Sequence, residues 1–168
     1  MAEKTGKVFL VGAGPGDPEL LTVKALNALK KADVIVYDRL VSQQILDLIG
    51  PGIARIFVGK AASNHHLAQE DINALLVKLA HSNHMVVRLK GGDPFIFGRG
   101  SEEAEYLAHR GVAFEVVPGV TAASGISAAL GIPLTHRGLS TGMRFVTGHA
   151  RAGESLDLDW KSLACEQT

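Results

Sequence analysis

The 168-residue sequence lacks several features that would assign it to particular classes of protein. Its single cysteine, Cys165, excludes an intrachain disulfide and a cysteine-rich zinc site. Its 17 lysines and arginines balance 17 aspartates and glutamates, so it has no excess of the positive charge that nucleic-acid phosphates require. The seven histidines have no cysteine or carboxylate partners at a recognisable ligand spacing, so we expect no metal site.

Long apolar runs are missing as well. The first apolar run covers only residues 8–11, which is too short for a signal peptide or a membrane span. Apolar residues make up 46% of the chain and charged residues 20%, as in ordinary globular proteins. We therefore expect a cytoplasmic enzyme or binding module with no nucleic-acid or membrane partner.

Glycine, in contrast, is abundant. It supplies 19 of the 168 residues, against an average usage of roughly 7%. Several glycines follow short apolar runs directly, at Gly12-Ala13-Gly14-Pro15-Gly16, Gly91-Gly92 and Pro118-Gly119. Glycines in a regularly patterned chain indicate a backbone that comes close to a ligand.

Short apolar runs alternate with helical patterns along most of the chain. The runs predict strands at 8–11, 34–37, 53–58, 85–89 and 114–117. The segments between them predict helices, one beginning at Pro18 with Asp17 as N-cap and another capped by Ser101 and ended by Gly111. Asp71 is a further candidate cap. This alternation predicts an α/β fold with an open, mainly parallel five-stranded sheet flanked by helices.

The pattern changes beyond this sheet. We expect residues 1–131 to form the first domain. Residues 132–142, which follow Gly131 and include Pro133, are expected to form a linker. One more strand is predicted at 143–147, and residues 143–168 are too few for an independent domain. They are interpreted as the start of an incomplete second α/β domain.

The first glycine loop allows two interpretations. Gly12-x-Gly14-x-Gly16 follows a strand and precedes a helix, as a dinucleotide-binding loop does. The third glycine of that fingerprint would be residue 17, which is an aspartate, and its carboxylate would compete with a pyrophosphate for the helix amides. The other interpretation is a turn that serves only the packing of helix on sheet.

The other loops offer polar groups at the edge where the parallel strands end and ligands bind. Asp93 follows the paired glycines, and Thr121 opens a helix whose first amides are free to donate. The apolar triplet 95–97 is unusual for a loop and either contacts a ligand or plugs the core. Asp38 comes directly after one predicted strand and Lys60 follows the next, so they are a candidate base and acid, although a surface ion pair would also explain them.

Five motifs in order resemble the tetrapyrrole methylase family. They are Val11-Gly12-Ala13-Gly14-Pro15-Gly16-Asp17-Pro18, Tyr37-Asp38-Arg39-Leu40-Val41-Ser42, Val58-Gly59-Lys60, Gly91-Gly92-Asp93-Pro94 and Thr121-Ala122-Ala123-Ser124. Together with Phe95-Ile96-Phe97-Gly98-Arg99-Gly100, they are similar to the members that act on uroporphyrinogen III. The resemblance runs from about Lys7 to the end of the chain.

The resemblance implies an enzyme with two α/β domains and an active site in the cleft between them. It would use S-adenosyl-L-methionine to methylate carbons 2 and 7 of uroporphyrinogen III, giving precorrin-2 and S-adenosyl-L-homocysteine, on the route to sirohaem, cobalamin or haem d1. Asp38 would be the proton acceptor and Lys60 the proton donor, and a homodimer is expected. The residues that would contact the cofactor are Pro15, Gly91, Gly92, Asp93, Ile96, Thr121 and Ala122.

The tetrapyrrole substrate carries eight carboxylates, so its cleft needs cations. The candidates by location are Arg39, Arg99, His136 and Arg137. Family members continue beyond the position that corresponds to Thr168, so we expect a C-terminally truncated chain that is not necessarily active. The alternatives left open are a nucleotide-binding module without catalysis and a module that only dimerises.

Overall fold

The computed structural model describes residues 6–59, 68–140, 142–148, 155–156 and 158–164. The chain divides into two compact units, Met1–Gly125 and Ile126–Thr168, and each is described by itself. Among the described residues, no helix is both long and apolar enough to cross a membrane.

The first unit is built on a five-stranded sheet in which every strand pair is parallel. The strand order is β3-β2-β4-β1-β5, so β1 and β4 lie at the centre. The strands are β1 (Lys7–Gly12), β2 (Val34–Tyr37), β3 (Ala54–Phe57), β4 (Met85–Lys90) and β5 (Ala113–Val117). The predicted open parallel sheet is therefore confirmed.

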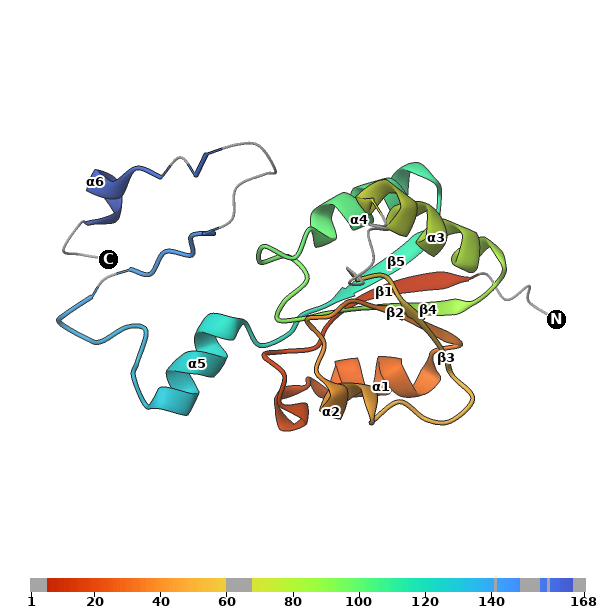
Figure 1. The fold of residues 1–168 in the computed structure, drawn as a ribbon, viewed down its shortest axis with the longest axis horizontal. Coiled ribbons are helices and arrows are strands. Elements are labelled where there is room, and N and C mark those ends of the chain that lie inside the picture. The colour runs from red at the N-terminus through yellow and green to blue at the C-terminus, as the bar shows by residue number, and fades with distance from the viewer. Residues whose placement is uncertain (1–5, 60–67, 141, 149–154, 157, 165–168) are drawn as a thin grey trace. The chain divides into compact units, whose positions relative to one another are not determined.

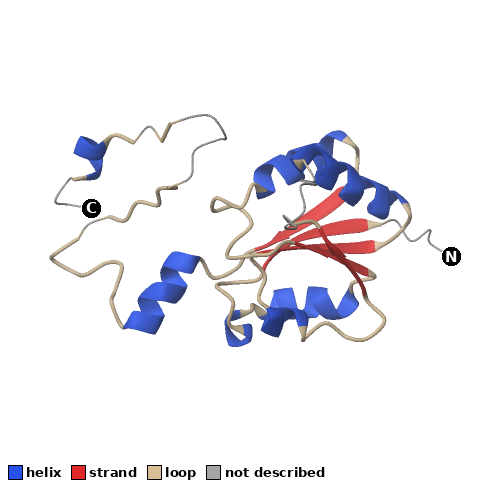
Figure 2. Cartoon of the chain, in the orientation of Figure 1, coloured by secondary structure: helices blue, strands red, loops and turns tan. Residues whose placement is uncertain are grey.

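Helices cover both faces of this sheet (Figures 1 and 2). The helical elements of this unit are η1 (Pro18–Leu20), α1 (Val23–Lys31), α2 (Gln43–Leu46), α3 (Gln69–His81), α4 (Gly100–His109) and the start of α5 (Ala122–Leu130). Side chains alternate along the strands, so Val87 packs with α1 and α2 on one face while Val86 packs with α3 and α4 on the other. Two apolar layers hold the sheet between the helices.

The helix predicted to begin at Pro18 is in fact two elements. Asp17 does cap the turn at Pro18, where its Oδ1 accepts a hydrogen bond from the Glu19 amide at 2.9 Å, but that turn is a 3₁₀ helix of three residues. Thr22 then caps α1 through its Oγ1, which accepts from the Ala25 amide at 3.0 Å. The prediction of one continuous helix was wrong because a second capping residue follows the first.

Two further capping predictions need correction. Ser101 lies inside α4, which begins at Gly100 after Arg99 in the left-handed conformation (φ 56°), and no side chain caps it. Gly100 is held at this start because its amide donates to the Pro94 carbonyl at 2.9 Å. Asp71 is the third residue of α3 and accepts from the Ala68 amide at 3.2 Å, so it supports the N-terminus from inside the helix. The predicted stop at Gly111 is confirmed by its φ of +66°.

The second unit contains the rest of α5 and a short helix, α6 (Trp160–Leu163). The strand predicted at 143–147 is absent: the described residues 142–148 form no regular element. A strand needs a hydrogen-bonded neighbour, and the described part of this unit contains no other strand to supply one. Arg144 instead donates from Nη1 to the Ser162 carbonyl at 2.6 Å. The domain limits at 131 and 142 stay predictions.

Replacing Gly12 by alanine tests how tightly the loops of the first unit are packed. A Cβ at residue 12 would lie 2.6 Å from both the Gly119 nitrogen and the Gly92 oxygen, and neither backbone atom can rotate away. We expect Gly12→Ala to lower the unfolding free energy by about 1–3 kcal/mol in urea denaturation. Gly50→Ala is the control, since its Cβ would meet only Ile53 Cδ1 at 3.9 Å. Equal stability of the two variants would contradict this packing.

Candidate functional site

The three glycine loops meet at one edge of the sheet. They follow β1, β4 and β5, which are parallel neighbours, so their carboxyl ends coincide. The first two loops are tied by a pair of hydrogen bonds, from the Gly14 amide to the Gly92 carbonyl at 3.1 Å and from the Gly92 amide to the Gly14 carbonyl at 2.7 Å. The predicted convergence of the loops is therefore confirmed.

At most of these positions only glycine fits, because the backbone of one loop lies in close contact with another loop. Side chains at Gly12 and Gly119 would collide with backbone of the facing loops, and a Cβ at Gly91 would lie 2.8 Å from the Cβ of Leu40. At Gly12 the constraint comes from the facing loops at Gly92 and Gly119 and not from a helix packed on the sheet. Gly92 differs, since it has a φ of +64° and the nearest atom to a Cβ there would be the Ala122 nitrogen at 4.0 Å. Gly92 is half-buried, and the position of its missing Cβ has more space around it than that of Gly12, Gly91 or Gly119.

Asp93 joins the second loop to the third. Its Oδ2 accepts from the Gly119 amide at 3.0 Å, and its Oδ1 accepts from the Phe95 amide at 2.8 Å. An ionised carboxylate accepts about four hydrogen bonds, so both oxygens keep capacity for a ligand. Asp93 thus fixes the loop cluster and still presents an acceptor there.

The other predicted cofactor contacts surround this cluster. Pro15 is exposed, and its ring lies so close to α5 that a Cβ at Gly125 would be 2.6 Å from the Pro15 Cγ. Thr121 caps α5, because its Oγ1 accepts from the Ser124 amide at 3.2 Å, and Ala122 is the first residue of that helix. Ile96 is 38% exposed between two more exposed phenylalanines, so the apolar triplet does not plug the core.

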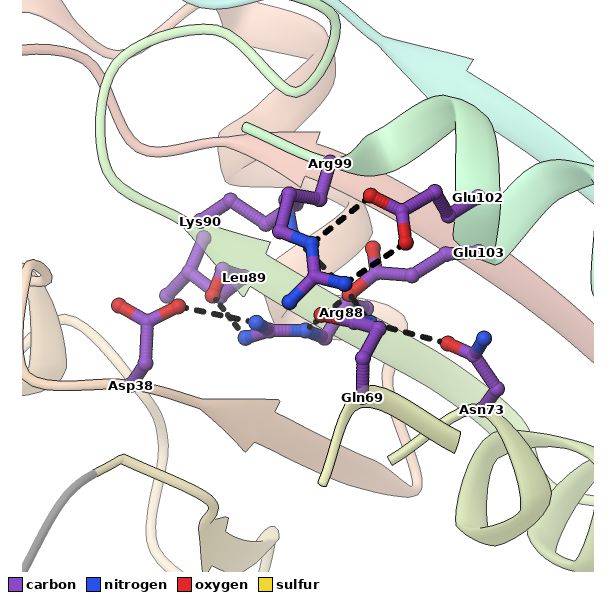
Figure 3. A network of polar contacts seen from close by, with 9 residues as sticks. All are labelled: Asp38, Gln69, Asn73, Arg88, Leu89, Lys90, Arg99, Glu102 and Glu103. Atoms are coloured by element: carbon purple, nitrogen blue, oxygen red, sulfur yellow. Dashed lines mark hydrogen bonds and ion pairs between the residues drawn. The ribbon is translucent and has the colours of Figure 1, made fainter. Parts of the chain in front are cut away.

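A second polar cluster lies beside the loops, at the ends of β2 and β4 (Figure 3). Its centre is Arg88 of β4, whose side chain is only 4% exposed. Arg88 donates from Nε to Glu103 Oε1 at 3.0 Å, from Nη2 to Asp38 Oδ2 at 2.9 Å and from Nη1 to the Leu89 carbonyl at 3.0 Å. Every nitrogen of the guanidinium therefore has a partner.

Glu103 of α4 is the fully buried anion of this cluster. Its Oε1 accepts from Arg88, from Lys90 Nζ at 3.0 Å and from Gln69 Nε2 at 3.2 Å (Figure 3). Its Oε2 has no partner among the described residues. Burial lowers the pKa of Lys90, the charge of Arg88 lowers it further, and Glu103 opposes both effects.

The candidate base is part of this cluster. Asp38 accepts from Arg88 through Oδ2 and from the Leu40 amide through Oδ1 at 3.0 Å, and its side chain is 22% exposed. Asp38 thus forms an ion pair with a buried arginine of the sheet, which the sequence analysis did not predict. Lys60, the candidate acid, lies outside the described residues.

The predicted substrate cations lie in both units. Arg39 is exposed in the first unit. Arg99 is exposed too, and it pairs with Glu102 through two hydrogen bonds of 2.8 and 2.7 Å. His136 and Arg137 are exposed in the second unit, where His136 Nδ1 lies 2.9 Å from the Arg137 carbonyl oxygen.

This cluster was not predicted, although the sequence carries signals for Arg88, Lys90 and Glu103. Arg88 and Lys90 are two residues apart in an otherwise apolar strand, so they share one face of the sheet. Glu103 occupies the same helical stripe as the buried residues Gly100, Ala104 and Leu107. A charge at the core-facing position of a strand or helix indicates a buried ion pair.

Comparison with known proteins defines the class to which this fold and site belong. Residues 7–165 match the family described as Tetrapyrrole (Corrin/Porphyrin) Methylases. The chain belongs to this family.

Among curated relatives, the chain is similar to siroheme synthase of Hahella chejuensis, with 62% identity over 156 residues, 93% of this chain and 33% of the relative. It is also 60% identical to siroheme synthase 2 of Pectobacterium atrosepticum over 162 residues, 96% of this chain and 35% of the relative. The chain thus spans about a third of the length of these relatives.

The chain is also similar in fold to solved structures of methyltransferases. Uroporphyrin-III-C-methyltransferase from Thermus thermophilus is 52% identical with a TM-score of 0.72, over 81% of this chain and 57% of that one. The same enzyme complexed with S-adenyl homocysteine is 54% identical with a TM-score of 0.69, over 82% and 57%. A cobalt precorrin-4 methyltransferase is 36% identical with a TM-score of 0.70, over 81% and 55%.

The lowered pKa of Lys90 predicts how the unfolding free energy depends on pH. Because burial lowers the pKa of Lys90 below its ordinary 10.5, the unfolded chain binds more protons between the two values, and the Lys90 contribution to the unfolding free energy rises with pH there. In Lys90→Met this contribution is missing. The difference in unfolding free energy between the native chain and the variant should therefore increase with pH, by at most about 1.4 kcal/mol per pH unit. A constant difference in urea denaturation from pH 7 to 10 would contradict this.

Proposed function

We propose that this chain takes part in S-adenosylmethionine-dependent C-methylation of uroporphyrinogen III, at carbons 2 and 7, to give precorrin-2. The observation that carries the proposal is the loop cluster at the carboxyl edge of the sheet, where no atom lies closer than 4.0 Å to the missing Cβ of Gly92. Membership of the methylase family and the similarity to uroporphyrin-III-C-methyltransferase support the substrate class.

The residues at the loop cluster fit S-adenosylmethionine. This cofactor has ribose hydroxyls, an amino-acid group and an adenine, so it needs donors, acceptors and apolar contacts together. Gly91 and Gly92 present backbone without side chains, although the amide and carbonyl of Gly92 already pair with Gly14. Asp93 offers spare acceptor capacity, and the first amides of α5 after Thr121 offer donors. Pro15, Ile96 and Ala122 supply the apolar contacts. When bound, S-adenosylmethionine supplies an electrophilic methyl group, and S-adenosylhomocysteine is released.

The chain's own groups orient the substrate and move protons. A pyrrole β-carbon that gains a methyl group becomes sp³, so a proton has to leave elsewhere, and the Asp38 carboxylate is the proposed acceptor. Lys60 is the proposed donor. Most of the rate enhancement would come from alignment of the methyl group with the ring carbon. The cations proposed to bind the substrate carboxylates are Arg39, Arg99, His136 and Arg137.

The proposed setting is a cytoplasmic homodimer that acts on a small molecule, with no nucleic-acid or membrane partner. Siroheme synthase relatives support a place in tetrapyrrole biosynthesis. The competing function is a nucleotide-binding module without catalysis, which would use the Gly12 loop. Thermal shift separates the two: S-adenosylhomocysteine should raise the melting temperature of the chain and NAD should not. A response to NAD alone would favour the competing function.

Asp93→Ala tests the cofactor site. The substitution frees the Gly119 and Phe95 amides and removes an acceptor from the loop cluster, so S-adenosylhomocysteine should bind more weakly by about 1–3 kcal/mol in isothermal titration calorimetry. Asp71→Ala is the matched control, since that carboxylate also holds a backbone amide but on α3. Equal affinity in the two variants would remove Asp93 from the cofactor site.

Asp38→Asn tests the proposed base. The amide keeps the shape of the side chain but cannot accept a proton, so methyl transfer from labelled S-adenosylmethionine should slow by roughly 10²–10⁴. The affinity for S-adenosylhomocysteine should hold. Asp47→Asn, which replaces a carboxylate paired with Gln43 on α2, should transfer methyl groups at the native rate. Native turnover of Asp38→Asn would show that the proton leaves by another path.

A further inference from the structure

Arg88 connects the interior of the first unit to the candidate base. We propose that Arg88 is a positioning residue, which holds the Asp38 carboxylate in one orientation, and that Glu103 fixes Arg88 in turn. The inference rests on the proposed function only in giving Asp38 the role of proton acceptor. Nothing in the resemblance to the methylases assigns a role to Arg88 or Glu103.

The carboxylate of Asp38 is held at two points. Arg88 Nη2 donates to Oδ2 at 2.9 Å, and the Leu40 amide donates to Oδ1 at 3.0 Å. One contact would leave the carboxylate free to turn about its Cβ–Cγ bond, whereas two contacts on different oxygens fix its plane. The carboxylate accepts about four hydrogen bonds in total, so it keeps acceptor capacity for a substrate.

The anchor of this arrangement is rigid. Glu103 is fully buried and the Arg88 side chain is 4% exposed, so both lie in a close-packed interior. The guanidinium is planar, and its Nε is fixed by Glu103 while Nη1 is fixed by the Leu89 carbonyl. With two of its three nitrogens fixed, Nη2 can point in only one direction, which is toward Asp38.

Stability alone does not account for these charges. A buried ion pair seldom stabilises a protein more than apolar residues of similar volume would, because of the cost of desolvation. The same face of β4 accepts an apolar residue at Val86, two positions earlier. The charges begin where β4 passes the end of β2, next to Asp38, and this position favours a role in orienting that side chain.

The experiment compares Arg88→Lys, Glu103→Gln and a control, Arg55→Lys, in the whole chain. Lysine keeps the charge of Arg88 but loses the planar fork, and glutamine keeps an oxygen acceptor for Arg88. Arg55 lies on β3, where it pairs in register with Ile35 of β2, and it donates to the Ile49 carbonyl at 2.9 Å. Two readouts are followed: the amide signal of Leu40 in ¹H–¹⁵N NMR, and kcat and KM for methyl transfer.

We expect Arg88→Lys to move the Leu40 signal and to lower kcat by on the order of tenfold to a hundredfold, with KM within about twofold of the native value. Glu103→Gln should change both readouts in the same direction by less, and Arg55→Lys should change neither. If Arg88→Lys does not fold, Glu103→Gln still decides, since it changes the anchor without touching Asp38.

If the Leu40 signal does not move in Arg88→Lys, the proposal is overturned. If Arg88→Lys does not fold, an unmoved Leu40 signal in Glu103→Gln overturns it instead. The proposal would also be overturned if the variant moved the Leu40 signal but kept the native kcat while Asp38→Asn was slow. The orientation of the Asp38 carboxylate would then not affect turnover. The NMR readout needs no turnover. A chain without methyl transfer would therefore contradict the proposed function, while the Leu40 amide would still decide whether Arg88 holds Asp38.

Discussion

The parallel pairing of β1 with both β4 and β5 is the constraint on which the rest of the first unit depends. Because parallel strands run in the same direction, three loops that are far apart in sequence leave the sheet at one edge. The loops then lie so close that glycine is required at Gly12 and Gly119, and Asp93 can reach across to the Gly119 amide. The candidate site is thus a direct product of the sheet topology.

The sequence was sufficient to predict the sheet and the convergence of its loops, since apolar runs and glycines are local signals. Contacts between distant side chains were beyond it. Asp38 and Arg88 are fifty positions apart, and only the strand order β2-β4 brings them together. Two helix starts were misplaced for a local reason: a second capping residue, Thr22, follows the one at Asp17, and α4 begins at Gly100 without any side-chain cap.

The interior of the first unit combines two kinds of packing. One face of the sheet is closed by apolar side chains from α1 and α2. The other face is apolar along α3 and α4 until the carboxyl edge, where Arg88, Lys90 and Glu103 replace the aliphatic residues. Charge is thus buried where the sheet borders the candidate site, and the lowered pKa of Lys90 is one measure of the cost of desolvation there.

The two hydrogen bonds between Gly14 and Gly92 also limit which insertions and deletions the loops can accept in evolution. They form an antiparallel bridge between two loops of a sheet that is otherwise parallel. An insertion or deletion of one residue between β1 and Gly14 would shift the bridge out of register unless the loop after β4 changed to match. The register of this bridge therefore couples the lengths of the two loops.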